Sequence, residues 1–298
     1  MLYAVIDVGS NAARLLFANA YGDKDNIRVE KATLIRIPLR LGKDVFHIGK
    51  ISKQKEEDFI KTMKAYKLLL EVYKTNGFKA VATAAMREAE NSDEILKKIK
   101  EATGIKIKVI SGAMEASIIR NTNKIAFSNP ERLTVFVDVG GGSTEISAER
   151  NGELIKLKSF KIGTIRMLTN EYDKYIWTSI ANWFKEFKDE FDSVNVVGSG
   201  GNINKINKIF GQANSIFLNI NTLQNAHDHL NELSIEERMN EYGMRQDRAD
   251  VIVPAAKIYL TIMNILKTKH IAVPKIGLAD GMVHQLYKEY LQNSQKTK

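Results

Sequence analysis

The chain has 298 residues, of which 44% are hydrophobic and 27% charged, as in a globular protein long enough to form two domains. It contains no cysteine, which excludes disulfide bonds, zinc–thiolate sites and cysteine nucleophiles and suits a cytoplasmic location. The formal net charge of +9 would attract a polyanion, but an ordinary solvated surface explains it equally well.

The first half of the chain predicts three strands followed by alternating helices and strands, in the order βββαβαβα. The expected strands are residues 2–7, 13–20, 34–41, 78–83 and 105–110, and the expected helices begin near Ser52, Asn91 and Ala113. The first strand is apolar, but it has no cationic residues before it and it reaches the acid Asp7 within seven residues. We therefore interpret it as a buried strand rather than a signal peptide.

The second half begins in the same way. The expected strands are residues 133–138, 144–148, 153–160 and 194–197, and the expected helices are one ending near Asp189, 222–240, 247–266 and one from about Asp280. The most apolar stretch, Val251–Leu266, contains Lys257 and Asn264 and is too short to span a bilayer, so we expect a core helix and no membrane association.

These two halves contain an internal repeat. The segment Val5-Ile6-Asp7-Val8-Gly9-Ser10-Asn11 aligns with Phe136-Val137-Asp138-Val139-Gly140-Gly141-Gly142. In each copy a buried strand ends in Asp-Val-Gly and turns tightly into a second strand, and each copy opens a three-strand unit. We therefore predict two duplicated α/β domains.

Both repeated turns have the composition of phosphate-binding loops. Glycine lets the backbone approach an anion closely, and successive N–H groups in a tight turn form a concave anion site. The candidate phosphate-binding residues are Gly9, Ser10, Asn11, Gly140, Gly141, Gly142, Ser143 and Thr144. The acids that precede the turns, Asp7 and Asp138, are suited to Mg²⁺ or its water shell. The alternative is a pair of ordinary hairpins, which explains one such turn well but two of them poorly.

The chain resembles the exopolyphosphatase/guanosine pentaphosphatase (Ppx/GppA) family. The resemblance rests on Ile6–Asn11, Arg40–Gly42, Ala82–Arg87, Ile110–Ala116, Asp138–Glu145, Val197–Gly201 and Arg248–Pro254, in this order along the chain. It implies two ribonuclease H-like (actin-like ATPase) domains, expected at residues 1–124 and 125–298, with the active site in the cleft between them. The final helix can pack back on the first domain.

The resemblance also implies roles for individual residues. Glu115 matches the catalytic glutamate that activates the attacking water, although Met114 stands where relatives often carry a second acid. Glu145 is a candidate metal ligand with Asp138, and the alternative for it is a solvated carboxylate on a strand face. Arg40 and Arg87 are candidate phosphate ligands, and we expect Arg87 where a loop enters a helix. Gly200 is a further candidate, although packing between a strand and a helix could by itself require glycine there.

The function that these features predict is Mg²⁺-dependent (or Mn²⁺-dependent) hydrolysis of the terminal phosphate of inorganic polyphosphate, by a homodimer without a specific nucleic-acid partner. The alternative is a guanosine pentaphosphate (pppGpp) 5′-phosphohydrolase, because both substrates end in a phosphoanhydride. A sugar-kinase-like phosphotransferase would need an acceptor site and an aspartate base, for which we find no pattern. A non-catalytic polyphosphate-binding or nucleotide-binding protein would have no use for Glu115.

Overall fold

The computed structural model describes residues 1–24, 26–122, 132–187, 190 and 193–296, and they form two compact units. Unit 1 comprises residues 1–118 and 278–298, and unit 2 comprises residues 119–277. The predicted domain boundary at residues 124 and 125, and the predicted helix end near Asp189, lie outside the described residues. Among the described helices, none combines the length and the apolar character that a membrane crossing requires.

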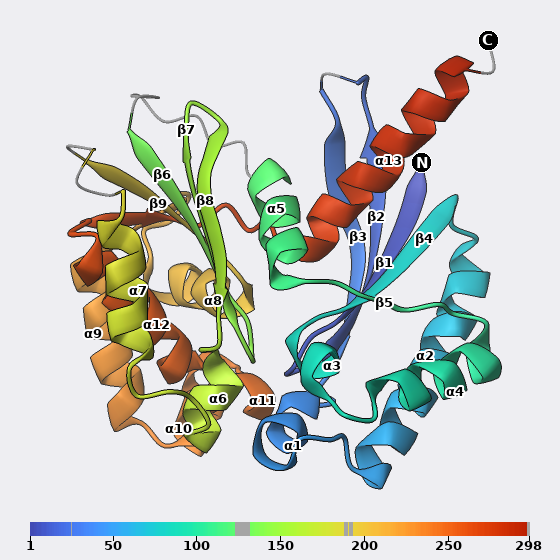
Figure 1. Cartoon of the computed structure of the whole chain (residues 1–298), viewed down its shortest axis with the longest axis horizontal. Coiled ribbons are helices and arrows are strands. Elements are labelled where there is room, and N and C mark those ends of the chain that lie inside the picture. The colour runs from blue at the N-terminus through green and yellow to red at the C-terminus, as the bar shows by residue number, and fades with distance from the viewer. Residues whose placement is uncertain (25, 123–131, 188–189, 191–192, 297–298) are drawn as a thin grey trace. The chain divides into compact units, whose positions relative to one another are not determined.

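Unit 1 is built on a five-stranded mixed sheet in the order β3-β2-β1-β4-β5 (Figure 1). Its strands are β1 (Leu2–Val8), β2 (Ala13–Tyr21), β3 (Arg28–Ile37), β4 (Gly77–Ala82) and β5 (Lys108–Val109). The first three are antiparallel neighbours, whereas β4 and β5 run parallel to β1. The helices of unit 1 are α1 (Leu41–Ile48), α2 (Lys53–Tyr73), α3 (Ala84–Glu88), α4 (Ser92–Thr103), α5 (Gly112–Thr122), which continues into unit 2, and α13 (Leu278–Lys296).

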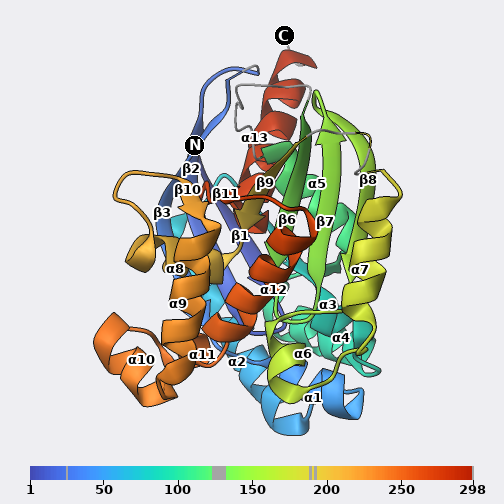
Figure 2. The ribbon, with the colours of Figure 1, turned by 90° about the vertical axis from the view of Figure 1, so that its left-hand side faces the viewer.

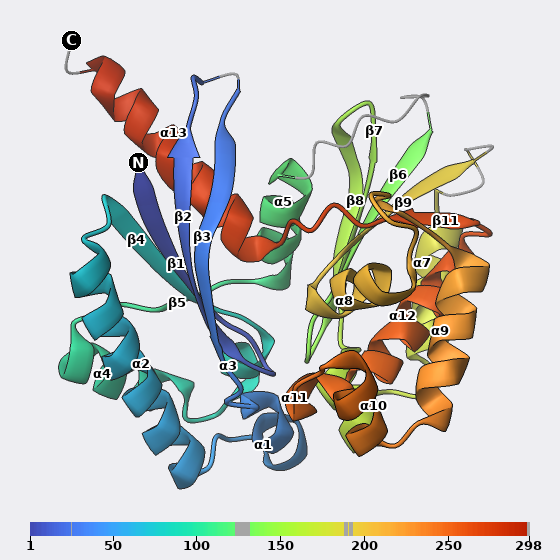
Figure 3. The same cartoon turned by 180° about the vertical axis from the view of Figure 1, so that it is seen from behind.

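Helices cover both faces of this sheet, because both faces of β1 are apolar. Ala4, Ile6 and Val8 pack with Phe59 and Met63 of α2 in one core. On the opposite face α13 packs across β1, β2, β3 and β4, which is visible in Figure 3. Tyr287 of α13 contacts Tyr3 edge to face, with ring centroids 6.2 Å apart. The sheet is therefore packed on both faces, by α2 on one and by α13 on the other.

Unit 2 repeats this arrangement with one additional strand, in the order β8-β7-β6-β9-β11-β10. Its strands are β6 (Leu133–Val139), β7 (Thr144–Arg150), β8 (Glu153–Phe160), β9 (Val194–Ser199), β10 (Phe217–Asn219) and β11 (His270–Ala272). Its helices are α6 (Thr164–Thr169), α7 (Ile176–Lys185), α8 (Gly201–Phe210), α9 (Ile220–Glu232), α10 (Ile235–Tyr242), α11 (Gln246–Ala249) and α12 (Ile252–Ile265). Leu133, Val135, Val137 and Val139 of β6 form one core with α7, α8, α9 and α12, and α12 contacts the other three helices (Figure 2).

The two sheets confirm the predicted duplication. In each unit a three-strand antiparallel meander is followed by a parallel strand beside the first strand of the meander, so that β1 corresponds to β6, β2 to β7 and β4 to β9. The registers also correspond, because Asp7 lies opposite Arg14 and Asp138 lies opposite Glu145.

Several predicted elements are wrong in detail. The strand expected over 105–110 is limited to Lys108–Val109, and the single helix expected to end near Asp189 is interrupted between α6 and α7. The strand expected over 34–41 covers Arg28–Ile37, and a helix begins at Leu41 after Arg40 adopts a left-handed conformation (φ 52°). The helix expected over 222–240 is two helices, because Ser234 and Glu237 form a capping box that starts α10. The helix expected over 247–266 is also interrupted, between Ala249 and Ile252.

Candidate functional site

The first repeated turn, at Gly9–Ala12 in unit 1, is a closed hairpin turn. The Gly9 N–H donates to the Ala12 carbonyl (3.0 Å). On its outer side the chain entering α1 supports it, because the N–H groups of Gly42 and Arg40 donate to the carbonyls of Ser10 (2.8 Å) and Asn11 (2.9 Å). The Ser10 hydroxyl is buried and has no hydrogen-bond partner among the described residues.

Asp7, the acid before this turn, has a cation as its cross-strand neighbour. Arg14 donates to the Asp7 carboxylate at 3.2 Å, and Asp7 is only 4% exposed. Burial raises the pKa of Asp7, and the Arg14 guanidinium opposes that rise without cancelling it. Arg14 therefore compensates the charge of Asp7 only in part.

The second turn, at Gly140–Ser143 in unit 2, has the same closure, since the Gly140 N–H donates to the Ser143 carbonyl (2.9 Å). Its other carbonyls are held by the start of α6. The backbone N–H groups of Thr164 and Ile165 donate to the carbonyls of Gly140 (3.0 Å) and Gly141 (2.8 Å). Arg166 Nε donates to the Gly142 carbonyl (2.6 Å). Within the described part of the chain, the N–H groups of Gly141 and Gly142 donate to no other residue. Two adjacent backbone donors are thus available to an anion.

Thr144 supports this turn from inside the unit. Its side chain is fully buried, and its hydroxyl donates to the Ile162 carbonyl at 2.7 Å. The hydroxyl therefore fixes the hairpin, and phosphate binding by Thr144 stays a prediction.

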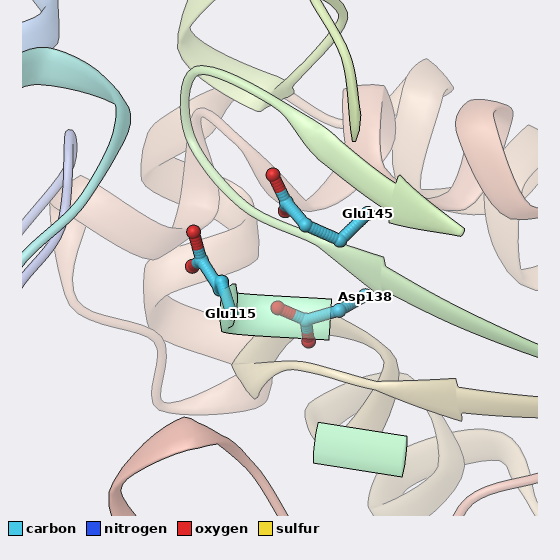
Figure 4. Close-up of side chains that lie close together, drawn as sticks. All are labelled: Glu115, Asp138 and Glu145. Carbon is cyan, nitrogen blue, oxygen red and sulfur yellow. The ribbon is translucent and has the colours of Figure 1, made fainter. Parts of the chain in front are cut away.

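Asp138 and Glu145 form the acidic centre of unit 2. They lie opposite each other at the last pairs of the β6–β7 ladder, and their carboxylate oxygens come within 4.8 Å (Figure 4). Ser199 Oγ donates to Asp138 Oδ1 (2.5 Å), and Ser159 Oγ donates to Glu145 Oε1 (2.8 Å). Glu145 is only 2% exposed, so it is not the solvated carboxylate of the alternative interpretation. Two adjacent carboxylates, one of them buried, repel each other unless a cation lies between them.

Glu115, also labelled in Figure 4, lies in the first turn of α5 in unit 1. Arg87 NH1 donates to Glu115 Oε2 (3.2 Å) and to the Ile110 carbonyl (2.9 Å), so one guanidinium ties this carboxylate to the end of β5. Arg87 lies in the last turn of the short helix α3 rather than at a helix entry, which corrects its expected position. In that position it can orient Glu115.

Gly200 lies between β9 and α8 with φ 114°, a conformation that favours glycine. A Cβ built there would lie 3.2 Å from the Val139 carbonyl and 3.5 Å from Asp138 Oδ1. Gly200 therefore lets the chain pass close to the acidic centre of unit 2.

Sequence reasoning missed several residues that shape these sites, namely Arg166, Gly163, Ser159, Ser199 and Tyr259. Ser199 lies within the Val197–Gly201 motif, and Tyr259 is an aromatic residue with a hydroxyl group in a mostly apolar helix, so both carried a signal. For Arg166, Gly163 and Ser159 the signal exists only in the tertiary contacts.

Comparison with known proteins adds independent findings. A model of the Ppx/GppA phosphatase family matches residues 31–290. The chain is 25% identical to exopolyphosphatase 1 of Mycobacterium leprae, with 95% of this chain and 88% of that protein covered. It is 25% identical to a guanosine-5′-triphosphate,3′-diphosphate pyrophosphatase of Vibrio parahaemolyticus, with 98% of this chain but 60% of that protein covered.

A bifunctional 3-dehydroquinate synthase/phosphatase of Fusobacterium nucleatum is 32% identical over 56% of this chain, and the matched region is 26% of that protein. Among solved structures, a Ppx/GppA family member of Aquifex aeolicus is 27% identical, with a TM-score of 0.72 and coverage of 97% and 98%. An exopolyphosphatase of Cytophaga hutchinsonii has the same fold at 21% identity, with a TM-score of 0.81 and coverage of 96% and 97%.

Proposed function

Because the chain belongs to the Ppx/GppA phosphatase family, we propose that it is an exopolyphosphatase that hydrolyses the terminal phosphoanhydride of inorganic polyphosphate. The observation that carries the proposal is the facing pair Asp138 and Glu145 beside a turn in which the N–H groups of Gly141 and Gly142 have no acceptor in the described part of the chain. The similarity to exopolyphosphatase 1 of M. leprae, which extends over nearly all of both chains, supports the substrate class.

The carboxylates of unit 2 fit a divalent cation. Mg²⁺ and Mn²⁺ prefer oxygen ligands, and the oxygens of Asp138 and Glu145 lie close enough for both to bind one ion directly or through its waters. When bound, the ion would supply positive charge to the phosphate oxygens in the transition state. Asp7 is less suited to a cation, because its carboxylate already pairs with Arg14.

The turns would bind the phosphate chain. The N–H groups of Gly141 and Gly142 are donors without an acceptor in the described chain, and the Ser10 hydroxyl is a buried donor in the same situation. Because α1 and α6 hold the carbonyls of the two turns, the donors are fixed before substrate binds. Donors that are fixed in advance stabilise the charge of the transition state without having to move during the reaction, which lowers the activation barrier.

Glu115 would act as the general base. Its carboxylate accepts a proton from the water that attacks the terminal phosphorus, and Arg87 holds the carboxyl group in one orientation. In-line attack requires this water beside the phosphate bound at the turns. We therefore propose that unit 1 supplies the base and unit 2 the cation ligands in the working enzyme.

The second candidate function is hydrolysis of the 5′-phosphate of guanosine pentaphosphate. The observation that favours it is the similarity to the Vibrio pyrophosphatase across 98% of this chain. The turns and the acidic pair bind only phosphate and cation, so they suit either substrate. The net charge of +9 favours a long polyanion, provided that outlying lysines bind it.

The test is phosphate release from long-chain polyphosphate, guanosine pentaphosphate and ATP, each with Mg²⁺ and with Glu115→Gln as the background control. We expect release from polyphosphate to have the highest kcat/KM. Preference for guanosine pentaphosphate would establish the second candidate, and release no faster than that of the control from every substrate would refute hydrolysis.

Binding to the Glu115→Gln protein across a salt series distinguishes the substrates further. Long polyphosphate that also contacts outlying lysines should lose affinity with salt more steeply than a short chain held by the turns alone. Equal slopes would argue against an extended binding track and for the second candidate.

We also propose an oligomeric state and a cellular location for the enzyme. Resemblance to the family supports a homodimer, which sedimentation velocity would test. The absence of cysteine supports a cytoplasmic enzyme, which fractionation of the source cells would test.

A further inference from the structure

Strands β6 and β9 separate at the residues that flank the acidic centre of unit 2. Asp138 and Ser199 are their last paired residues, and the chain then turns away at Gly200. Strand ends that diverge leave backbone polar groups without ladder partners, and buried groups of this kind require other partners.

The hydroxyl of Tyr259 fills this opening. Tyr259 lies on α12 and is 1% exposed. Its hydroxyl accepts a hydrogen bond from the Val139 N–H (3.3 Å) and donates one to the Ser199 carbonyl. One phenol therefore joins the ends of β6 and β9 immediately beside Asp138, and it does so from a helix anchored in the core of the unit.

The Ser199 side chain acts on the carboxylate itself. Its hydroxyl donates to Asp138 Oδ1 at 2.5 Å, which restricts the rotation of the carboxyl group. Ser199 is 2% exposed, so water does not compete for this hydrogen bond. The orientation of Asp138 thus depends on Ser199, and the position of Ser199 depends on Tyr259.

Unit 1 provides an internal comparison. There Asp7 is flanked by Arg14 on β2 and by Val81 on β4, so it has a permanent cation on one side and an apolar residue on the other. In unit 2 the same register positions hold Glu145 and Ser199. The second copy therefore places a second acid opposite Asp138, where the first copy has an arginine, and adds a donor that orients Asp138.

We propose that Ser199 and Tyr259 are positioning residues that preset the Asp138 carboxylate for a divalent cation shared with Glu145. The inference rests on the proposed function for the identity of the ligand. Residues behind a metal ligand commonly tune metal affinity by orienting that ligand, which is the role that these contacts support.

The test is Mn²⁺ binding to the full-length protein, measured from the electron paramagnetic resonance signal of free Mn²⁺ without substrate. We expect Ser199→Ala to weaken Mn²⁺ binding about tenfold or more, the usual effect of losing such a contact. Ser199→Thr keeps the hydroxyl and should restore affinity. Tyr259→Phe should also weaken Mn²⁺ binding, but less than Ser199→Ala does, because it removes only the hydrogen bond that holds Ser199 in place.

Two matched controls separate positioning from general loss of stability. Ser147→Ala removes a buried hydroxyl of β7 that has no hydrogen-bond partner in the described chain, and it should leave Mn²⁺ affinity unchanged. Tyr287→Phe removes a phenol that donates to the Gly22 carbonyl in unit 1 (2.9 Å), and it should also leave affinity unchanged. Thermal unfolding of each variant shows that it is folded at the temperature of the binding measurement.

Equal Mn²⁺ affinity of wild type, Ser199→Ala and Tyr259→Phe would overturn the inference and leave the proposed hydrolase intact. Failure of the wild-type protein to bind Mn²⁺ would overturn both the metal site and the inference. Tight Mn²⁺ binding that depends on Ser199, in a protein that releases no phosphate, would support the inference and refute the proposed function.

Discussion

The substitution Gly163→Ala tests whether the position of the Gly140–Ser143 turn controls activity. Gly163 precedes α6 in an extended conformation (φ −158°), which alanine adopts without strain, so the substitution changes only the space that the residue fills. A Cβ at this position would lie 2.6 Å from the carbonyl carbon and oxygen of Gly141 and 2.7 Å from the Gly142 nitrogen.

Ordinary contacts of a Cβ begin at 3.4 Å, so the turn has to move away from Gly163 by about 0.8 Å. A displacement of about 1 Å at a reacting group can cost on the order of 100-fold in rate. Backbone atoms rather than a flexible side chain must shift, and overpacking of this kind costs about 1–3 kcal/mol of stability. We therefore expect kcat/KM to fall on the order of 100-fold in a folded but destabilised protein.

The assay is steady-state phosphate release with Mg²⁺, together with chemical denaturation of each variant. Gly77→Ala is the matched control, because the nearest atoms to its Cβ would be those of the Tyr3 ring at 3.6 Å, an ordinary contact, and we expect nearly wild-type kinetics. If Gly163→Ala retained kcat/KM within about threefold of wild type, the position of the Gly140–Ser143 turn would not control the rate, and the turn would not be the phosphate site.

Three further predictions follow from individual carboxylates. Glu115→Gln should lower kcat by about 100-fold or more with little change in substrate binding, because it removes a base and keeps the shape; kcat above about a tenth of wild type would contradict the assignment. Asp138→Ala should raise the Mg²⁺ concentration needed for half-maximal activity, and full wild-type activity in excess chelator would contradict the metal site. Asp7→Asn should raise the unfolding free energy at pH 7, since burial raises the pKa of Asp7 and its charged form therefore destabilises the fold. The gain in unfolding free energy over wild type should be absent below the unfolded-state pKa of Asp7 and should grow as the pH rises to its folded-state pKa. A variant that is less stable than wild type at pH 7 would show that Arg14 stabilises the charged form more than burial destabilises it, and a gain that does not change with pH would show that the charge of Asp7 is not its cause.

Features of the fold that depend on local chemistry were predictable from the sequence. Strands β1 and β6 are short apolar runs, and each ends at a glycine-containing turn after an acid, so the duplication and both candidate phosphate turns could be recognised. The start of α10 could also have been recognised, because Ser234 and Glu237 have the spacing of a capping box. It was missed because the helical spacing of apolar residues continues from α9 into α10.

The contacts that distinguish the two copies arise from tertiary structure. Asp7 and Asp138 occupy the same place in the repeat, yet one faces Arg14 and the other faces Glu145, and only the strand register brings these residues together. Helix α1 begins where Gly42 reaches the Ser10 carbonyl, 32 residues earlier in the chain, so strand periodicity near Leu41 could not predict it.

The sequence by itself thus determined the repeated strands, the two turns and the acids beside them, because turn formation and strand burial depend on neighbouring residues. The tertiary structure decided which acid faces an arginine and which faces a second carboxylate. Arg87 reaches Glu115 across 28 residues, and Tyr259 reaches the Ser199 carbonyl across 60. Hydrogen bonds of this range depend on how helices pack against the sheet, and no local pattern records that packing.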